Sequence, residues 1–353
     1  MFLSGRIRSW GLWLKAGLGM FALLAAVVLV PLHAGAAPKP TVEQVRQRIK
    51  DLNQQAEVAT ERYNDLREQI AGLNVRIEAA KTKVAEQQKV VARARAELAR
   101  VAADTYKAGD MAALELFFSD RPDNFVHANG LLMGLDARKK QAMDDVLTQQ
   151  RQLVAMMTDV QAQQQKLEKA RKDLQSTRVE IERKLDEQNA ILARLTEDDR
   201  SRLGRLDAGE TRESLEQQGI TVPKSRRLGC DDVPVAPPDA RVAKVLAYAC
   251  AQMGDPYRWG ADGPTSFDCS GLTMMAWKQA GVSLPHSSQL QARYGTKVRV
   301  SDLRPGDLVF FHGGLTHVGI YIGKGAMVHA PHTGAFVEIQ GLKGRTVVTA
   351  VRL

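Results

Sequence analysis

A hydrophobic repeat with a period of 3.5 residues runs through the first part of the chain and limits its fold more than any other feature. From position 42 to position 101, apolar residues recur at alternating intervals of three and four over nine heptads. One row is Val42, Ile49, Ala56, Tyr63, Ile70, Ile77, Val84, Val91 and Leu98, and the other is Val45, Leu52, Ala59, Leu66, Leu73, Ala80, Gln87, Ala94 and Val101. This is the seam of a coiled coil, which predicts one helical arm of roughly 95–100 Å.

A second arm repeats the pattern more loosely, and polar residues interrupt its companion row. Its apolar row is Val146, Leu153, Val160, Leu167, Leu174, Ile181, Gln188 and Leu195. Between the arms, segment 106–135 contains an apolar cluster and a turn-like stretch at 120–123, which predicts a small helical tip. Because the arms are similar in length, we expect residues 41–205 to form an antiparallel hairpin within one chain. A parallel dimer of long helices is the alternative.

Residues 1–36 have the parts of a secretory signal peptide. An apolar run at 18–30 is followed by the small residues 34–36, and it is preceded by three basic residues, Arg6, Arg8 and Lys15. A retained membrane anchor is the alternative, although the run is at the short end for a membrane span. We therefore expect the mature protein to be secreted and to work at the cell wall, where disulfides persist.

The composition narrows the classes of partner. The chain has 353 residues, of which 25% are charged and 44% hydrophobic, and its net charge is +9. This excludes a polytopic membrane protein and a fully disordered chain. Three of the positive charges lie in the predicted signal peptide, and no nucleic-acid-binding motif accompanies the rest. The mature protein is thus mildly basic and suited to anionic surfaces.

The chain changes character after the second arm. Segment 206–239 contains helix-interrupting glycines and prolines, so we expect a linker there. Residues 240–353 then predict one α+β domain, with helices first and an antiparallel sheet after them. The expected helices are 242–253 and 269–280, and the expected strands are 308–311, 318–322, 327–330, 336–339 and 347–351.

Cys269 is the candidate nucleophile of this domain. It begins the second predicted helix, where free N–H groups and partial positive charge lower the pKa of a thiol and can serve as an oxyanion hole. Thiol catalysis also needs a histidine base and a third group that orients its ring. His317 and His329 flank the turn at 323–325, which would place them on one face of two antiparallel strands. We expect His317 to be the base and His329 its partner; a buried structural cysteine is the alternative.

Four segments of the domain follow in a characteristic order. They are DPYRWG at 255–260, FDCSGL at 267–272, LRPGDLVFF at 303–311 and HVGIY at 317–321. Together they resemble the NlpC-type bacterial cell-wall peptidases, which are papain-like thiol hydrolases. The resemblance covers roughly residues 240–350 and implies a triad of Cys269, His317 and His329. It also implies that Tyr257 acts at the oxyanion or substrate side, and that Asp268 and Ser270 line the pocket for a free amine.

The resemblance further implies a substrate class and a kind of regulation. Family substrates are peptidoglycan stem peptides, which are cut beside γ-D-glutamate, usually before the diamino acid, and no cofactor is implied. The layout is similar to secreted hydrolases of cell separation. In some of these the helical region docks on the division transporter FtsEX or blocks the active site. By analogy of architecture, we expect a membrane regulator of the FtsEX type to bind the hairpin.

Other readings of the same residues stay open. The hairpin could recruit or activate another wall hydrolase while its own domain is inert, and an acyltransferase or amidase could share the fold. His312 and His332 beside the triad histidines suggest zinc, but the chain lacks a His-Glu-x-x-His motif, so no metal is expected. Cys230 and Cys250 are left over in a secreted chain and predict a disulfide between the linker and the first helix of the domain.

Overall fold

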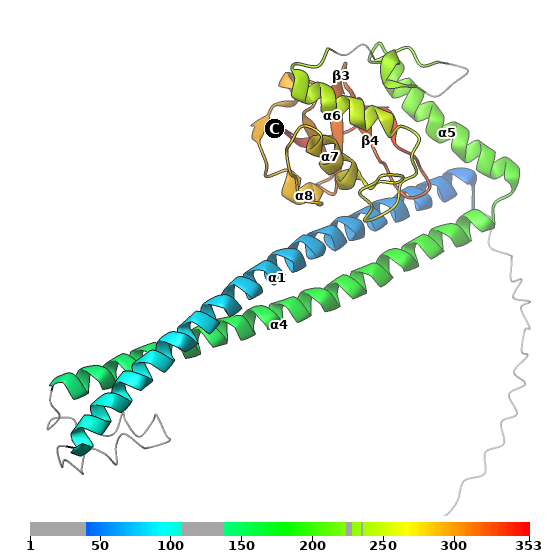
Figure 1. Cartoon of the computed structure of the whole chain (residues 1–353). Coiled ribbons are helices and arrows are strands. Elements are labelled where there is room, and N and C mark those ends of the chain that lie inside the picture. The colour runs from blue at the N-terminus through cyan, green and yellow to red at the C-terminus, as the bar shows by residue number, and fades with distance from the viewer. Residues whose placement is uncertain (1–39, 108–136, 224–227, 234–235) are drawn as a thin grey trace, which may run out of the picture. The chain divides into compact units, whose positions relative to one another are not determined.

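The computed structural model describes residues 40–107, 137–223, 228–233 and 236–353 (Figure 1). The predicted signal peptide and almost all of the predicted tip therefore lie outside the described residues. The part of the chain from Thr41 to Leu353 forms one compact unit. None of the described helices is both long and apolar enough to cross a membrane.

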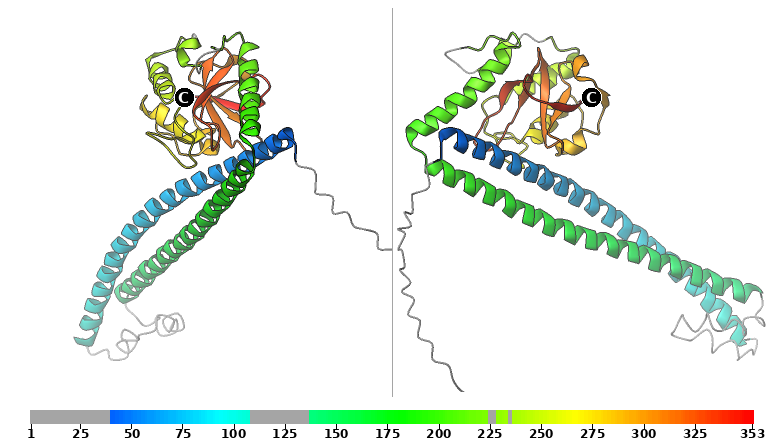
Figure 2. Two further views of the ribbon diagram at one scale, coloured as in Figure 1. Left: turned by 90° about the vertical axis from the view of Figure 1, so that its right-hand side faces the viewer. Right: turned by 180° about the vertical axis from the view of Figure 1, so that it is seen from behind.

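Two long helices form the first half of this unit. Helix α1 spans Val42–Lys107 and helix α4 spans Ala137–Ala193. They run antiparallel along each other, as Figures 1 and 2 show. Their shared core is buried, and it includes the cluster of Leu73, Ile77, Leu167 and Ala170. These are residues of the predicted heptad rows or their immediate neighbours, so the seam explains why the two helices pack together.

A buried polar residue interrupts this seam. Gln87 occupies a heptad position and is 9% exposed. Its side-chain amide donates hydrogen bonds to Gln149 Oε1 at 2.8 Å and to the Gln149 carbonyl oxygen at 3.1 Å. Because a buried amide must find partners, this pair favours one alignment of α1 against α4 over its neighbours.

A third helix, α5 (Glu197–Glu216), differs from the expected organisation. The segment predicted to be a linker from residue 206 begins as helix, even though Gly204 and Gly209 each cost about 1 kcal/mol relative to alanine. Two features offset that cost. Thr196 caps the helix by accepting from the Asp199 N–H, beside an acidic first turn, and Leu203 and Leu215 are buried.

The second half of the unit contains three helices on a six-stranded sheet. The helices are α6 (Ala240–Ala251), α7 (Cys269–Lys278) and α8 (Ser288–Gln291). The strands are β1 (Thr296–Val298), β2 (Leu308–Phe311), β3 (His317–Gly323), β4 (Ala326–His329), β5 (Glu338–Gly341) and β6 (Val347–Arg352). All pairs are antiparallel, in the order β1-β6-β2-β3-β4-β5. The predicted fold class, long helices followed by an α+β domain, is confirmed. The four-residue helix α8 and the short, largely exposed strand β1 were not expected.

The core of this domain lies between the sheet and helices α6 and α7. Val318, Ile320 and Ile322 of β3 alternate toward this core, together with the fully buried Phe267 and Trp277. The opposite face of the sheet has its own smaller cluster around Phe311 and Met327. Both faces are thus covered, which fixes β3 and β4 as a rigid base for the side chains at their ends.

A disulfide joins Cys230, in a 3₁₀ turn (Cys230–Asp232), to Cys250 in α6, with the two Cα atoms 5.9 Å apart. The two residues are separated by 20 positions in the sequence. Because a crosslink of this span restricts the unfolded chain, replacing both cysteines by serine should lower the free energy of unfolding by about 3 kcal/mol. Urea unfolding followed by tryptophan fluorescence would measure the loss. Adding reductant to the parent protein should reproduce it, and two free thiols in the non-reduced protein would contradict the prediction.

Candidate active site

Cys269 begins helix α7, as predicted. The preceding Asp268 caps the helix, because its Oδ1 accepts from the Gly271 N–H at 2.7 Å. Cys269 is 1% exposed. The turn into α7 is so tight that a Cβ at Gly271 would lie 2.2 Å from the Ala261 carbonyl oxygen. Only glycine fits there, which explains the small residue two positions after the cysteine.

The two predicted histidines meet on one face of the sheet. His317 is the first residue of β3 and His329 the last of β4, and the strand register continues from the pair Ile320–Val328. Gly319 lies between them, and a Cβ there would come within 2.6 Å of Met327 Sδ. With this close approach of the strands, His317 Nε2 lies 2.7 Å from His329 Nδ1. The ring contact is buried, since the histidines are 3% and 1% exposed.

Cys269 and His317 lie together at the centre of the site. The Cys269 Sγ and a ring nitrogen of His317 are within 4.8 Å of each other. The Nε2 of His317 faces His329, whose pKa is well below its ordinary value because of burial and the neighbouring His317. A neutral His329 can hydrogen-bond to the His317 ring and fix its orientation without placing a second positive charge beside it. The arrangement therefore provides a thiol, a base and an orienting group.

The remaining predicted site residues surround the sulfur. Tyr257 is buried, and its pKa is well above the ordinary value because of burial and the nearby Cys269 and Asp268, so its hydroxyl keeps its proton and can donate. Burial alone would raise the pKa of Asp268, but His286, whose Nε2 lies 2.8 Å from its Oδ1, lowers it. Asp268 is thus a buried carboxylate, with the Ser270 hydroxyl 3.3 Å away.

Helix α1 also contributes to this site, which sequence analysis did not predict. Glu61 of α1 is fully buried. Its carboxylate accepts from Ser270 Oγ at 2.8 Å and from the Ser288 N–H at 2.7 Å, and Cys269 Sγ lies 3.4 Å from it. Asn64, one turn further along, donates to Asp268 Oδ2 at 2.9 Å. The side-chain amide of Asn64 thus donates to Asp268, the carboxylate that is expected to bind the amine of the substrate.

Further contacts extend this face of α1 in both directions. Toward its N-terminus, Glu57 Oε1 lies 2.5 Å from His317 Nδ1. Toward its C-terminus, Glu68 accepts from the His286 N–H at 2.9 Å, and Asp65 accepts from the Ser287 hydroxyl. We call Glu57, Glu61, Asn64, Asp65 and Glu68 the cleft face of α1. These residues recur every three or four positions, so one side of the helix fills the site.

An aromatic contact supports the cleft face. Tyr63 packs edge-on against Trp259 with ring centroids 5.1 Å apart, and a Cβ at Gly260 would lie 3.3 Å from the Tyr63 ring. Tyr63 was assigned to the heptad seam from its spacing, but its ring contacts the C-terminal domain instead. The polar residues of the cleft face have the spacing of any exposed coiled-coil face, so the sequence does not distinguish them from a solvated surface.

Comparison with known proteins identifies the domain. Residues 254–351 match the sequence profile of the NlpC/P60 family. The C-terminal part of the chain is an NlpC/P60 domain. The chain is 40% identical over 139 residues to "Probable endopeptidase Cgl2188" of Corynebacterium glutamicum, which covers 39% of this chain and 66% of that protein. It is 48% identical over 115 residues to "Probable endopeptidase Rv2190c" of Mycobacterium tuberculosis, which covers 31% of this chain and 30% of that one.

Among solved structures, the crystal structure of the NlpC/p60 domain of peptidoglycan hydrolase SagA is 34% identical. It covers 32% of this chain and 98% of that chain, with a TM-score of 0.31. The chain spans less than two thirds of the length of the curated relatives reported above.

The cleft face changes the electrostatics of the NlpC/P60 thiol. The pKa of Cys269 is well above its ordinary value, because of burial first and then the neighbouring acids Glu61, Asp268 and Glu57. The lowering expected from the start of α7 is therefore outweighed while α1 is in place. Since the thiolate is the nucleophile, the sulfur is held in its unreactive form.

The same neighbourhood has donors that suit a metal ion. Glu57, Cys269 and His317 each offer one ligand atom, and these atoms lie within 4.8 Å of one another. Thiolate, imidazole and carboxylate are the donors that zinc accepts in proteins. One of the three comes from α1, so such a set exists only while the helix contacts the NlpC/P60 domain.

The contact between α1 and the NlpC/P60 domain should weaken as the pH rises. Burial and the neighbouring Asp268 raise the pKa of Glu61 from 4.5 to about 7. In the contact Glu61 keeps its proton up to about pH 7, whereas an exposed glutamate loses it near 4.5. The stabilisation is therefore complete below pH 4.5 and is lost as the pH rises through 7. Hydrogen exchange of residues 57–68, corrected for intrinsic rates, would measure this change.

Glu61→Gln is the matched control for this prediction. Glutamine keeps the shape and an acceptor oxygen but does not titrate in this range. The variant should show a flatter dependence of protection on pH between 4.5 and 7. An equal slope in the parent and the variant would mean that other groups, such as the site histidines, govern the dependence.

Proposed function

We propose that this chain is a secreted cysteine endopeptidase that cleaves peptidoglycan stem peptides beside γ-D-glutamate, before the diamino acid, in cell separation or wall remodelling. The observation that carries the proposal is the buried row of Cys269, His317 and His329 in an NlpC/P60 domain. Its relatives are named probable endopeptidases, which agrees with the proposal.

The geometry supports a thiol mechanism in two stages. His317 takes the proton of Cys269, and the sulfur attacks the carbonyl carbon of the scissile amide. The oxyanion accepts hydrogen bonds from the start of α7 and from the Tyr257 hydroxyl. His317 then gives its proton to the leaving amine, and a thioester forms. Water, deprotonated by His317, attacks the thioester, releasing the acid and restoring the thiol.

The substrate's amino end is proposed to bind at Asp268. A buried carboxylate is stable only with donors or a positive charge beside it, and a free α-ammonium group supplies both. Ser270 lies against the same carboxylate and adds an acceptor for the ammonium. A stem peptide bound in this way has its amine at a fixed distance from Cys269, which would select the bond that is cut.

Helix α1 is proposed to keep the enzyme inactive. The hydrogen bonds of Glu61 use the Ser270 hydroxyl and the Ser288 N–H, and Asn64 occupies the Asp268 carboxylate. The proposed amine site needs Ser270 and Asp268, so a substrate cannot bind while α1 is in place. Activation would require α1 to leave, and we propose that a membrane regulator of the FtsEX type, bound to the helical hairpin, withdraws it.

The triple variant Glu61→Ala/Asp65→Ala/Glu68→Ala should therefore be more active than the parent chain. Each substitution removes at least one hydrogen bond between α1 and the NlpC/P60 domain, and a typical hydrogen bond contributes about 0.5–1.5 kcal/mol. We expect the release of soluble fragments from purified sacculi to rise at least roughly tenfold, since each 1.4 kcal/mol is a factor of ten in a population.

Two controls distinguish the outcomes. Glu78→Ala/Glu86→Ala/Glu182→Ala removes three acids from exposed positions of the arms and should leave the activity at the parent level. Adding Cys269→Ala to the active triple variant should abolish fragment release. If that release persists, the enzyme proposal fails, and an adaptor that recruits another hydrolase becomes the better account. Equal activity of parent and triple variant would reject inhibition by α1.

A further inference from the structure

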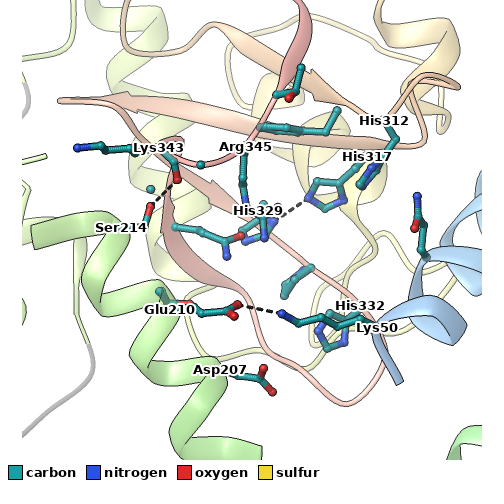
Figure 3. Close-up of a pocket in the computed structure, with 18 of the residues that line it drawn as sticks. Lys50, Asp207, Glu210, Ser214, His312, His317, His329, His332, Lys343 and Arg345 are labelled. Carbon is teal, nitrogen blue, oxygen red and sulfur yellow. Dashed lines mark hydrogen bonds and ion pairs between the residues drawn. The ribbon is translucent and has the colours of Figure 1, made fainter. Parts of the chain in front are cut away.

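A large cavity adjoins the catalytic histidines on the side away from Asp268. It has a volume of about 970 Å³ and lies between α1, α5 and the sheet (Figure 3). His317 and His329 line it, whereas Asp268, Cys269 and Ser270 do not. The cavity therefore adjoins the catalytic site at its two histidines and not at Cys269.

The direction of α1 gives the order of positions along the cleft. Asn64 lies at Asp268, Glu61 at Cys269 and Glu57 at His317, while Lys50 lines the cavity. A peptide with its amine at Asp268 and its scissile carbonyl at Cys269 must extend past His317. The base that protonates the leaving amine has to lie beside it. The cavity is thus where the leaving group would lie once α1 has moved.

The wall that the NlpC/P60 domain gives to this cavity is mainly cationic. Its cations are Lys343 and Arg345, against one acid, Glu338. The wall also has His312 and His332, whose pKa values burial lowers, so both favour the neutral form. The Arg345 guanidinium points into the cavity in Figure 3 and has no hydrogen bond or ion pair with any residue that the structure describes. The carboxylates of Glu57, Glu338 and Glu210 act on it only at a distance.

The helices place acids opposite this wall. Glu57 of α1 has its Oε2 3.7 Å from His312 Nε2, and Asp207 and Glu210 of α5 line the facing side. The loop that carries Arg345 is held against α5, because Ser214 Oγ donates to the Lys343 carbonyl oxygen at 3.0 Å. Asp207 and Glu210 are already paired with Arg46 and Lys50 of α1. The acid that contacts the wall of the NlpC/P60 domain is therefore Glu57, at His312.

We propose that Arg345 and His312 form a carboxylate-binding subsite for the leaving group, so that the enzyme prefers stem peptides whose residue after the scissile bond carries a free carboxylate. The planar guanidinium binds a carboxylate through two parallel hydrogen bonds, and an N–H of His312 adds a third donor. Glu57 then occupies the place of the substrate's carboxylate while α1 is in the cleft. This inference rests on the proposed function.

Two synthetic stem peptides test the subsite. They differ only in whether the leaving diamino acid carries a free carboxylate or a carboxamide. The full chain with Glu61→Ala/Asp65→Ala/Glu68→Ala should cleave the carboxylate peptide with a kcat/KM roughly 10- to 100-fold higher, the range for one charged hydrogen bond. Adding Arg345→Gln should lower kcat/KM for the carboxylate peptide to the carboxamide level and leave the carboxamide peptide unchanged. Arg345→Lys should restore part of the preference.

Lys278→Gln, which removes an exposed cation at the end of α7, is the matched control and should change neither rate. Unchanged cleavage of the carboxamide peptide by the Arg345→Gln variant shows that it folds. Equal cleavage of both peptides before Arg345 is changed, a preference for the carboxamide, or an equal loss on both peptides after the change would overturn the subsite. Cleavage of neither peptide by the triple variant would instead remove the proposed function, and the subsite with it.

Discussion

The buried carboxylate of Glu61 is the contact on which the arrangement of this protein depends. A carboxylate enclosed by protein is tolerated only where donors surround it, and here Ser270 of α7 and the N–H of Ser288 in α8 supply them. One side chain of α1 thus joins two separate elements of the NlpC/P60 domain. The same carboxylate lies close to Asp268, and two neighbouring acids disfavour each other's ionised form. The contact has a specific geometry, but ionisation of Glu61 weakens it. Such a contact suits a helix that must dissociate from the active site during activation.

The C-terminal domain could be predicted largely from the sequence because its signals are local. Strands β2 to β6 follow apolar stretches that are bounded by glycines and prolines. The pairing of His317 with His329 follows from one short turn, because the hairpin register fixes which residues share a face. Cys269 was placed correctly because Asp268 is a strong helix-capping residue, so the start of α7 could be read from adjacent positions.

The contribution of α1 could not be predicted, because nothing local distinguishes it. Glu57, Glu61 and Asn64 have the composition and spacing of a solvated coiled-coil face, and their partners lie more than 200 positions away in the sequence. Tyr63 lies at a position of the apolar heptad row, so its spacing predicts packing against α4 and not the observed contact with Trp259. The elevated pKa of the Cys269 thiol has the same origin, since it depends on burial beneath α1. Helix α5 was missed because its two glycines outweighed a good cap in a local reading.

The pairing of Gln87 with Gln149 has a mechanical consequence. Helix α1 is continuous over 66 residues, so its seam with α4 and its cleft face cannot move independently. A slip of α1 by one heptad would let apolar rows pack again, but it would separate this polar pair and carry Glu61 about 10 Å along the cleft. A half-turn of the helix about its axis would expose the acids altogether. A force or torque applied to the far end of the hairpin would therefore move α1 along its whole length and expose Cys269.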